Sequence, residues 1–162
     1  MSQTNELEIM ERIALDLERV EESLASSFNT GAEDFNALIR PLSAAGGKRL
    51  RAQLCLLIAN AGTSVERQRI RIAEAVEMLH LATLIHDDVL DQAEIRRGEE
   101  TIHMHKGNKV AILSGDYLFA KAFQIVSEMP NMKYLQIFSH IITCLVEGEF
   151  MQMEDVYRID QG

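Results

Sequence analysis

The chain has 162 residues, of which 47% are hydrophobic and 25% are charged, so it can form one globular core of ordinary composition. Its net charge of −9 argues against a general nucleic-acid binder, and no apolar run approaches the roughly 20 residues of a membrane span. The polar, acidic N-terminus lacks the pattern of a signal segment. Cys55 and Cys144 lie in apolar helical contexts and predict buried thiols without a disulfide framework, so we expect a cytoplasmic protein.

The first half of the chain predicts three helices. Apolar residues recur every three or four positions over residues 7–28, which indicates an amphipathic helix ended by Asn29-Thr30-Gly31. A short helix over residues 33–40 should stop at Pro41, because proline lacks a backbone donor. The turn Ala44-Ala45-Gly46-Gly47 then opens a helix over residues 48–60.

The second half continues the helical pattern. Thr63 and Glu66 have the spacing of a capping box, and Asn108 and Asn131 can each cap a later helix. No strand-like alternation is evident. The expected helices cover residues 63–91, 108–129 and 131–156, with a flexible polar stretch over residues 92–107. The predicted fold class is therefore all-α, an antiparallel helical bundle.

An acidic cluster, His86-Asp87-Asp88-Val89-Leu90-Asp91, ends the long central helix. Asp87 and Asp91 are four residues apart and share a face with His80, whereas Asp88 points about 100° away. Stacked carboxylates repel each other, and a hard cation such as Mg²⁺ together with a substrate phosphate would turn this repulsion into binding. The alternative is an acidic helix end in solvent, although acid at a C-terminus opposes the helix dipole.

Two basic elements accompany this cluster. Gly46-Gly47 precedes Lys48 and Arg51 at a helix start, where glycine, backbone N–H groups and two cations together suit an anion. Arg96-Arg97-Gly98 begins five residues beyond Asp91 and can fold back over the end of the helix. Each element taken alone also fits a solvated helix start or an ordinary surface loop.

In their order and spacing, these elements resemble the trans-isoprenyl diphosphate synthases. The matching segments are residues 46–51, 77–80, 86–91, 96–98, 107–118 and 147–152. The resemblance implies an all-α prenyltransferase fold around a central cavity. It also implies condensation of isopentenyl diphosphate with an allylic diphosphate.

The resemblance assigns a role to each matching polar residue. Asp87 and Asp91 would be the catalytic aspartates, coordinating the Mg²⁺ that holds the allylic diphosphate. Arg96 would contact that same diphosphate. The diphosphate of isopentenyl diphosphate would be bound by Lys48, Arg51, His80 and Arg97.

Product length depends on the residues just upstream of the first aspartate. Bulky side chains there block the growing prenyl chain in this family. Ala82 and Thr83 occupy those positions and are small. The resemblance therefore implies a medium- or long-chain polyprenyl diphosphate.

The sequence departs from the family in length. Family members are roughly twice as long and carry a second aspartate-rich motif, which is absent from these 162 residues. We therefore expect residues 1–162 to be the N-terminal half of one polyprenyl synthase-type domain, inactive alone, with apolar surface exposed. The implied assembly is a homodimer or a complex with a partner subunit. The alternative is a non-catalytic or regulatory subunit of a heteromeric synthase.

Overall fold

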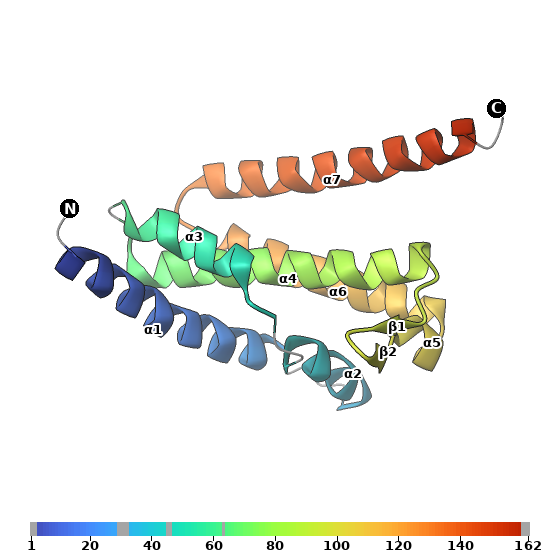
Figure 1. The fold of residues 1–162 in the computed structure, drawn as a ribbon, viewed down its shortest axis with the longest axis horizontal. Helices are drawn as coiled ribbons and strands as arrows, with labels where there is room; N and C mark the ends of the chain where they lie inside the picture. Colours follow the sequence, from blue (N-terminus) through green and yellow to red (C-terminus); the bar gives the residue numbers. More distant parts are fainter. Residues whose placement is uncertain (1–2, 29–32, 45–46, 63, 160–162) are drawn as a thin grey trace. The chain divides into compact units, whose positions relative to one another are not determined.

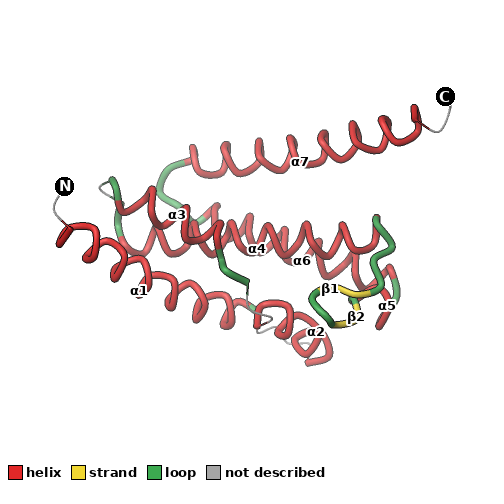
Figure 2. Tube along the Cα trace, viewed as in Figure 1, coloured by secondary structure: helices red, strands yellow, loops and turns green. Residues whose placement is uncertain are grey.

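The computed structural model describes residues 3–28, 33–44, 47–62 and 64–159, and these are almost entirely helical (Figures 1 and 2). The chain divides into two compact units, residues 1–125 and 126–162. The elements are α1 (Gln3–Ser27), α2 (Glu33–Ala44), α3 (Leu50–Asn60), α4 (Glu66–Leu90), β1 (Ile95–Arg96), β2 (Glu99–Glu100), α5 (Ile102–Lys106), α6 (Asn108–Ser127) and α7 (Met132–Ile159). The predicted all-α class is confirmed.

The core of the first unit lies where α1, α3 and α4 pack against one another. The predicted apolar stripe supplies the buried residues Val20 and Leu24 of α1 and Phe28 just after it, whereas Leu7 and Met10 at the N-terminal end of α1 are exposed. Each fully buried side chain of this size stabilises the fold by about 1.5–3 kcal/mol. This packing, more than helix propensity, holds the three helices together.

Buried carboxylates fix α1 against α4. Asp16 accepts hydrogen bonds from Nε and Nη2 of Arg69, at 2.6 and 3.1 Å. Glu74 accepts from the hydroxyls of Ser23 and Ser27, both at 2.7 Å. A buried carboxylate is costly unless it is paired in this way, so these contacts specify the register of the two helices.

Several helix ends differ from the sequence predictions. Pro41 lies inside α2, which continues to Ala44, so the predicted stop was wrong. Packing overrides the local penalty there, because Ile39 of the same helix is fully buried. The helix α3 begins at Leu50 after Arg49, and α4 begins at Glu66 after Val65. Thr63, Asn29-Thr30-Gly31 and Gly46 lie outside the described residues.

The predicted cap at Asn131 is confirmed. Its side-chain oxygen accepts the backbone N–H of Lys133 at 2.9 Å, which satisfies one of the donors left open at the start of α7.

On α7, Cys144 is exposed, contrary to prediction, while Cys55 on α3 is half-buried and both thiols are free.

Residues 92–107, which were expected to be flexible, contain a β-hairpin. Strands β1 and β2 pair antiparallel, with Arg96 opposite Glu99. Arg97 and Gly98 form the two-residue loop with φ values of 55° and 85°, the signs of a type I′ turn, which suits the twist of a hairpin. Thr101 is buried, and its hydroxyl donates to the Ala93 carbonyl at 2.8 Å, closing the base of the hairpin.

Within the described chain, α6 is the one helix long and apolar enough to meet the criteria for a membrane span. A core helix of a packed domain meets the same criteria. Leu118 and Ala122 of α6 are fully buried in this structure, as in such a core helix.

Candidate functional site

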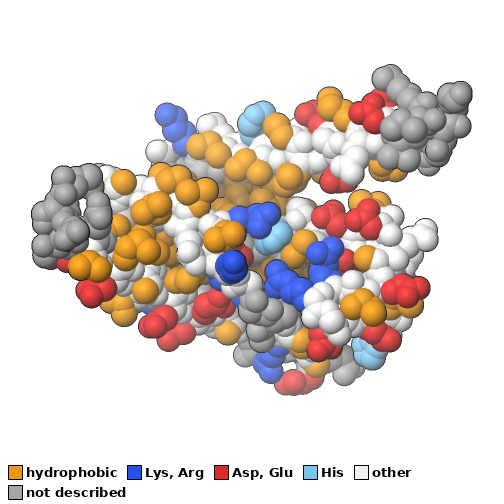
Figure 3. All heavy atoms as spheres, viewed as in Figure 1, with side chains coloured by type: hydrophobic (Ala, Val, Ile, Leu, Met, Phe, Trp, Pro, Cys, Tyr) orange, Lys and Arg blue, Asp and Glu red, His pale blue; other side chains and the backbone are white. Residues whose placement is uncertain are grey.

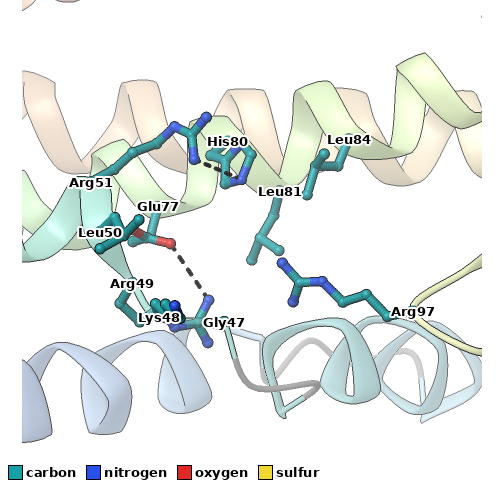
Figure 4. Close-up of a pocket in the computed structure, with 10 residues that line it drawn as sticks. All are labelled: Gly47, Lys48, Arg49, Leu50, Arg51, Glu77, His80, Leu81, Leu84 and Arg97. Atoms are coloured by element: carbon teal, nitrogen blue, oxygen red, sulfur yellow. Dashed lines mark hydrogen bonds and ion pairs between the residues drawn. The ribbon is translucent and has the colours of Figure 1, made fainter.

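A pocket of about 240 Å³ opens in the first unit, and three segments distant in sequence line it (Figure 4). On the face drawn in Figure 3, Lys and Arg side chains gather around a histidine, with acidic side chains nearby. The lining comprises Gly47, Lys48, Arg49, Leu50 and Arg51 at the start of α3, Glu77, His80, Leu81 and Leu84 of α4, and Arg97 of the hairpin loop.

The structure brings together the four residues expected to bind isopentenyl diphosphate. Lys48, Arg51, His80 and Arg97 all line this one pocket. Spacings of three and four residues place Glu77, His80 and Leu84 on the same face of α4. The start of α3 contributes basic side chains together with the positive end of the helix dipole, which favours a bound anion.

Arg51 and His80 contact each other across the pocket. Arg51 Nη1 lies 3.0 Å from His80 Nε2. Because arginine has no acceptor, Nε2 must accept this hydrogen bond, so the proton of the neutral ring is on Nδ1. Burial and the charge of Arg51 lower the pKa of His80 below its ordinary value, and Glu77 opposes that shift. The imidazole is therefore neutral at pH 7.

Arg97 reaches the pocket from the hairpin because of the tight turn at Arg97 itself and the absence of a side chain at Gly47. Its own φ of 55° places it in the tight turn. Its guanidinium packs over Gly47, where an added Cβ would come within 3.3 Å of Arg97 Nη2. A side chain at position 47 would therefore crowd the arginine that folds back from the hairpin.

Arg96 is held at the edge of this arrangement. Its Nε donates to Oδ1 of the buried Asp88 at 2.6 Å, which fastens the hairpin to the end of α4. This contact agrees with the prediction that Asp88 points away from Asp87. Arg96 is not among the residues that line the pocket.

Asp87 and Asp91 retain helical geometry although α4 formally ends at Leu90. The Asp91 N–H donates to the Asp87 carbonyl at 2.8 Å, so the two side chains share a face. Asp87 is half-buried and Asp91 is exposed. Among the described residues no three His, Cys, Asp or Glu side chains form a metal cluster. Two carboxylates suit Mg²⁺ that also takes waters and phosphate oxygens, and do not suit an all-protein cage.

His86 has a role that sequence reasoning missed. Its ring lies against Gly115 of α6 so closely that a Cβ there would come within 2.2 Å of Nε2. The same nitrogen is 3.2 Å from the Ile112 carbonyl. Gly115 in the middle of a helical pattern was the available signal, because such a glycine often marks a close approach.

Arg49 and Glu77 also line the pocket and were not assigned from the sequence. The position of Glu77, three residues before His80, is the signal that could have identified it. The two positions assigned to product length differ from each other. Ala82 is fully buried, while Thr83 is half-buried and its hydroxyl donates to the His80 carbonyl at 2.8 Å.

Comparison with known proteins gives a consistent result. A family model described as polyprenyl synthetase matches residues 32–161. Solanesyl diphosphate synthase 1, a chloroplastic protein of Arabidopsis thaliana, is 33% identical over 158 residues, covering 94% of this chain and 39% of that protein. Heptaprenyl diphosphate synthase component 2 of Geobacillus stearothermophilus is 38% identical over 147 residues, covering 90% of this chain and 46% of that protein.

A solved structure supports the same relationship. Polyprenyl synthase from Caulobacter crescentus CB15, complexed with calcium and isoprenyl diphosphate, matches with a TM-score of 0.84 and 35% identity. The match covers 90% of this chain and 44% of that one. The chain therefore spans less than half the length of these relatives.

Proposed function

The chain belongs to the polyprenyl synthetase family, and from that premise we propose that it carries the isopentenyl diphosphate site and the first metal site of a polyprenyl diphosphate synthase. The observation that carries this proposal is the convergence of Lys48, Arg51, His80 and Arg97 on one pocket. These residues come from the segment that opens α3, from α3 and α4, and from the hairpin loop, and together they offer charged and hydrogen-bonding groups to a diphosphate.

The proposed reaction joins isopentenyl diphosphate to an allylic diphosphate. The basic residues of the pocket hold the isopentenyl diphosphate and orient its double bond. Leu81 and Leu84, which also line the pocket, supply apolar wall near the reacting carbons. Such a wall excludes water from the allylic cation formed when the C–O bond breaks. The double bond attacks that cation, and the resulting carbocation gives up a proton to the released diphosphate, so the chain need supply no nucleophile.

We assign the metal site to Asp87 and Asp91, whose carboxylates share the face beyond His80 and Leu84. The oxygen donors and their i, i+4 spacing fit Mg²⁺ shared with a substrate diphosphate. When bound, Mg²⁺ supplies positive charge that stabilises the leaving diphosphate. Arg96 is the arginine we assign to the allylic diphosphate, with Asp88 setting its position.

We infer that the product is a medium- or long-chain polyprenyl diphosphate, because positions 82 and 83 carry small side chains. The names of the solanesyl and heptaprenyl relatives support this. In the complete enzyme, Thr83→Phe should shorten the product, as chromatography of the prenyl products will show. Thr83 is the better test position, since Ala82 is fully buried and phenylalanine there would overpack the core. An unchanged product distribution would count against this assignment.

We propose that residues 1–162 act as the N-terminal half of one catalytic domain, within a homodimer or beside a partner subunit. The half-domain proposal is supported by the relatives' greater length, of which this chain covers less than half. The proposal of a partner subunit is supported by the name "component 2" of one relative. The competing function is a non-catalytic helical subunit whose aspartate motif no longer binds metal. The observation that keeps this alternative in view is that, among the described residues, no three His, Cys, Asp or Glu side chains form a metal cluster.

The test is metal-dependent binding of a non-hydrolysable allylic diphosphate analogue to the 162-residue protein. We expect Mg²⁺ to strengthen binding, and Asp87→Ala to abolish this strengthening because one of two carboxylate ligands is lost. Glu94→Gln, at an exposed carboxylate just beyond the motif, is the matched control and should bind like the wild type. Mg²⁺-independent binding in all three proteins would favour the non-catalytic subunit. Prenyl transfer by the purified chain alone would refute the half-domain proposal.

A further inference from the structure

A buried ion pair lies beside the basic side chains of the pocket (Figure 4). The Glu77 side chain is 3% exposed and the Arg49 side chain 5%, and Glu77 Oε2 lies 3.5 Å from Arg49 Nη1. Arg49 Nε and Nη2 donate to the two carboxylate oxygens of Glu21 on α1, at 2.5 and 3.1 Å. These carboxylates raise the pKa of Arg49 against the opposing effect of burial, which is the largest single influence.

This pairing separates Arg49 from its basic neighbours. Lys48 and Arg51 are exposed, whereas the guanidinium of Arg49 is buried and held by carboxylates from two different helices. A cation already neutralised in this way contributes little to holding an external anion. Its function therefore concerns the geometry of the loop that carries Lys48 and Arg51.

The backbone at Arg49 supports that interpretation. Its φ of 44° and ψ of 39° are left-handed, a conformation that non-glycine residues seldom adopt without surrounding support. Arg49 is the N-cap of α3 and makes no side-chain capping bond. Contacts with Glu21 and Glu77 hold the residue in the conformation from which α3 begins.

Glu77 supplies the missing cap from α4. Its Oε1 accepts the backbone N–H of Ala52, in the first turn of α3, at 3.0 Å. This is one of the donors that a helix start leaves open. Arg51 precedes Ala52 directly, and His80 lies one turn beyond Glu77. The Glu77 carboxylate, which docks α3 on α4, is thus close to both Arg51 and His80, whose side chains contact each other at 3.0 Å.

We propose that Glu77 and Arg49 are positioning residues of the diphosphate site, which dock the start of α3 on α4 so that Arg51 and His80 face the same ligand. The diphosphate ligand itself rests on the proposed function, whereas the docking does not. Neither residue touches the substrate. Their effect passes through Arg51 and His80.

The decisive comparison is Glu77→Gln against Glu74→Gln. Both carboxylates are buried on α4, and Glu74 is ion-paired with Arg71 at 2.7 Å. Glu74 is not among the residues that line the pocket, so its variant controls for the general cost of losing a buried charge. A role confined to stability would affect both variants alike.

Two measurements separate positioning from stability. Calorimetric titration with isopentenyl diphosphate should give roughly tenfold weaker binding for Glu77→Gln and wild-type binding for Glu74→Gln. In the ligand-free protein, NMR of the His80 ring nitrogens should show that Nε2 loses the hydrogen bond from Arg51 in Glu77→Gln, because that contact depends on the docking of α3. The same Nε2 signal should be unchanged in Glu74→Gln.

The outcomes are distinguishable. If the wild type binds and Glu77→Gln binds equally well, the positioning role is overturned. If the wild type does not bind, the proposed function fails, and NMR of the His80 ring nitrogens still decides the positioning role, because an unchanged Nε2 signal in Glu77→Gln contradicts it. If Glu77→Gln does not fold, Arg49→Lys replaces it, since lysine keeps the charge but cannot span Glu21 and Glu77. That variant should show the same weakening, and wild-type affinity in it contradicts the proposal.

Discussion

His80 is the residue at which burial, charge and hydrogen bonding meet in the pocket. Its imidazole accepts a hydrogen bond from Arg51 and is half-buried, so the folded protein favours the neutral ring. A bound diphosphate would oppose that preference, because a nearby anion stabilises the imidazolium. His80 thus links the protonation of the site to its occupancy.

We predict that His80 makes the stability of the protein depend on pH below about 6.5. Because its folded pKa is lowered, the unfolded chain takes up the proton first as the pH falls, and the free energy of unfolding decreases. This loss begins near the unfolded pKa and is complete below the lowered folded value.

Denaturant unfolding of the wild type and of His80→Asn over about pH 8 to pH 5 measures this effect. Asparagine does not titrate, so the wild type should lose more stability on acidification than the variant. Parallel curves for the two proteins would show that the environment of His80 does not favour the neutral ring.

At the scale of elements, α4 and α6 meet where the ring of His86 lies against Gly115. The ring is also near Phe119, with ring centroids 5.4 Å apart. This contact fixes the part of α4 that carries Asp87, and it leaves no room for a methyl group at position 115. Packed interiors respond to a change of even one carbon atom.

We predict that Gly115→Ala destabilises the protein by about 1–3 kcal/mol, because His86 must leave its position. Gly148→Ala is the matched control, since Gly148 is also within a helix and an added Cβ there meets nothing within 4 Å. It should be neutral or stabilising by up to about 1 kcal/mol.

Thermal unfolding followed by circular dichroism measures both changes. Adding His86→Ala to Gly115→Ala should remove most of the extra cost, because the clash requires both side chains. Equal effects of the two glycine substitutions would contradict a specific contact at Gly115.

Periodic patterns in the sequence were sufficient for most of the elements. The helices other than α5, the cap at Asn131 and the shared face of Asp87 and Asp91 follow from local spacing. The short helix α5 lies in the stretch expected to be flexible and was missed. The hairpin was missed because its loop, Arg97-Gly98, lacks the common Asn-Gly signal, and Pro41 was overruled by packing.

The residues of the site also divide into those that the sequence identified and those that it did not. Lys48, Arg51, His80 and Arg97 were grouped through resemblance to a family, and the structure places them in one pocket. Arg49 is 28 residues after Glu21 and 28 residues before Glu77 in the sequence, so no local spacing encodes their pairing. Contacts between distant segments depend on how the helices dock, and local patterns in a single sequence do not reveal that docking.

At the scale of the whole molecule, charge is distributed unevenly. The chain carries a net charge of −9, yet basic side chains dominate its pocket. Such local concentration attracts anions despite the overall sign. Apolar side chains also remain exposed, and they include Leu54 and Ile58 of α3 and Phe150 and Met151 of α7.

Calorimetric titration of isopentenyl diphosphate into Arg51→Gln tests most directly whether this pocket binds a diphosphate. Arg67→Gln is the control, because Arg67 is an exposed arginine of α4 that does not line the pocket. We predict that the wild type and Arg67→Gln bind equally, and that Arg51→Gln binds at least about tenfold more weakly through loss of a charged hydrogen bond. Equal affinity in all three proteins would contradict the assignment of the pocket.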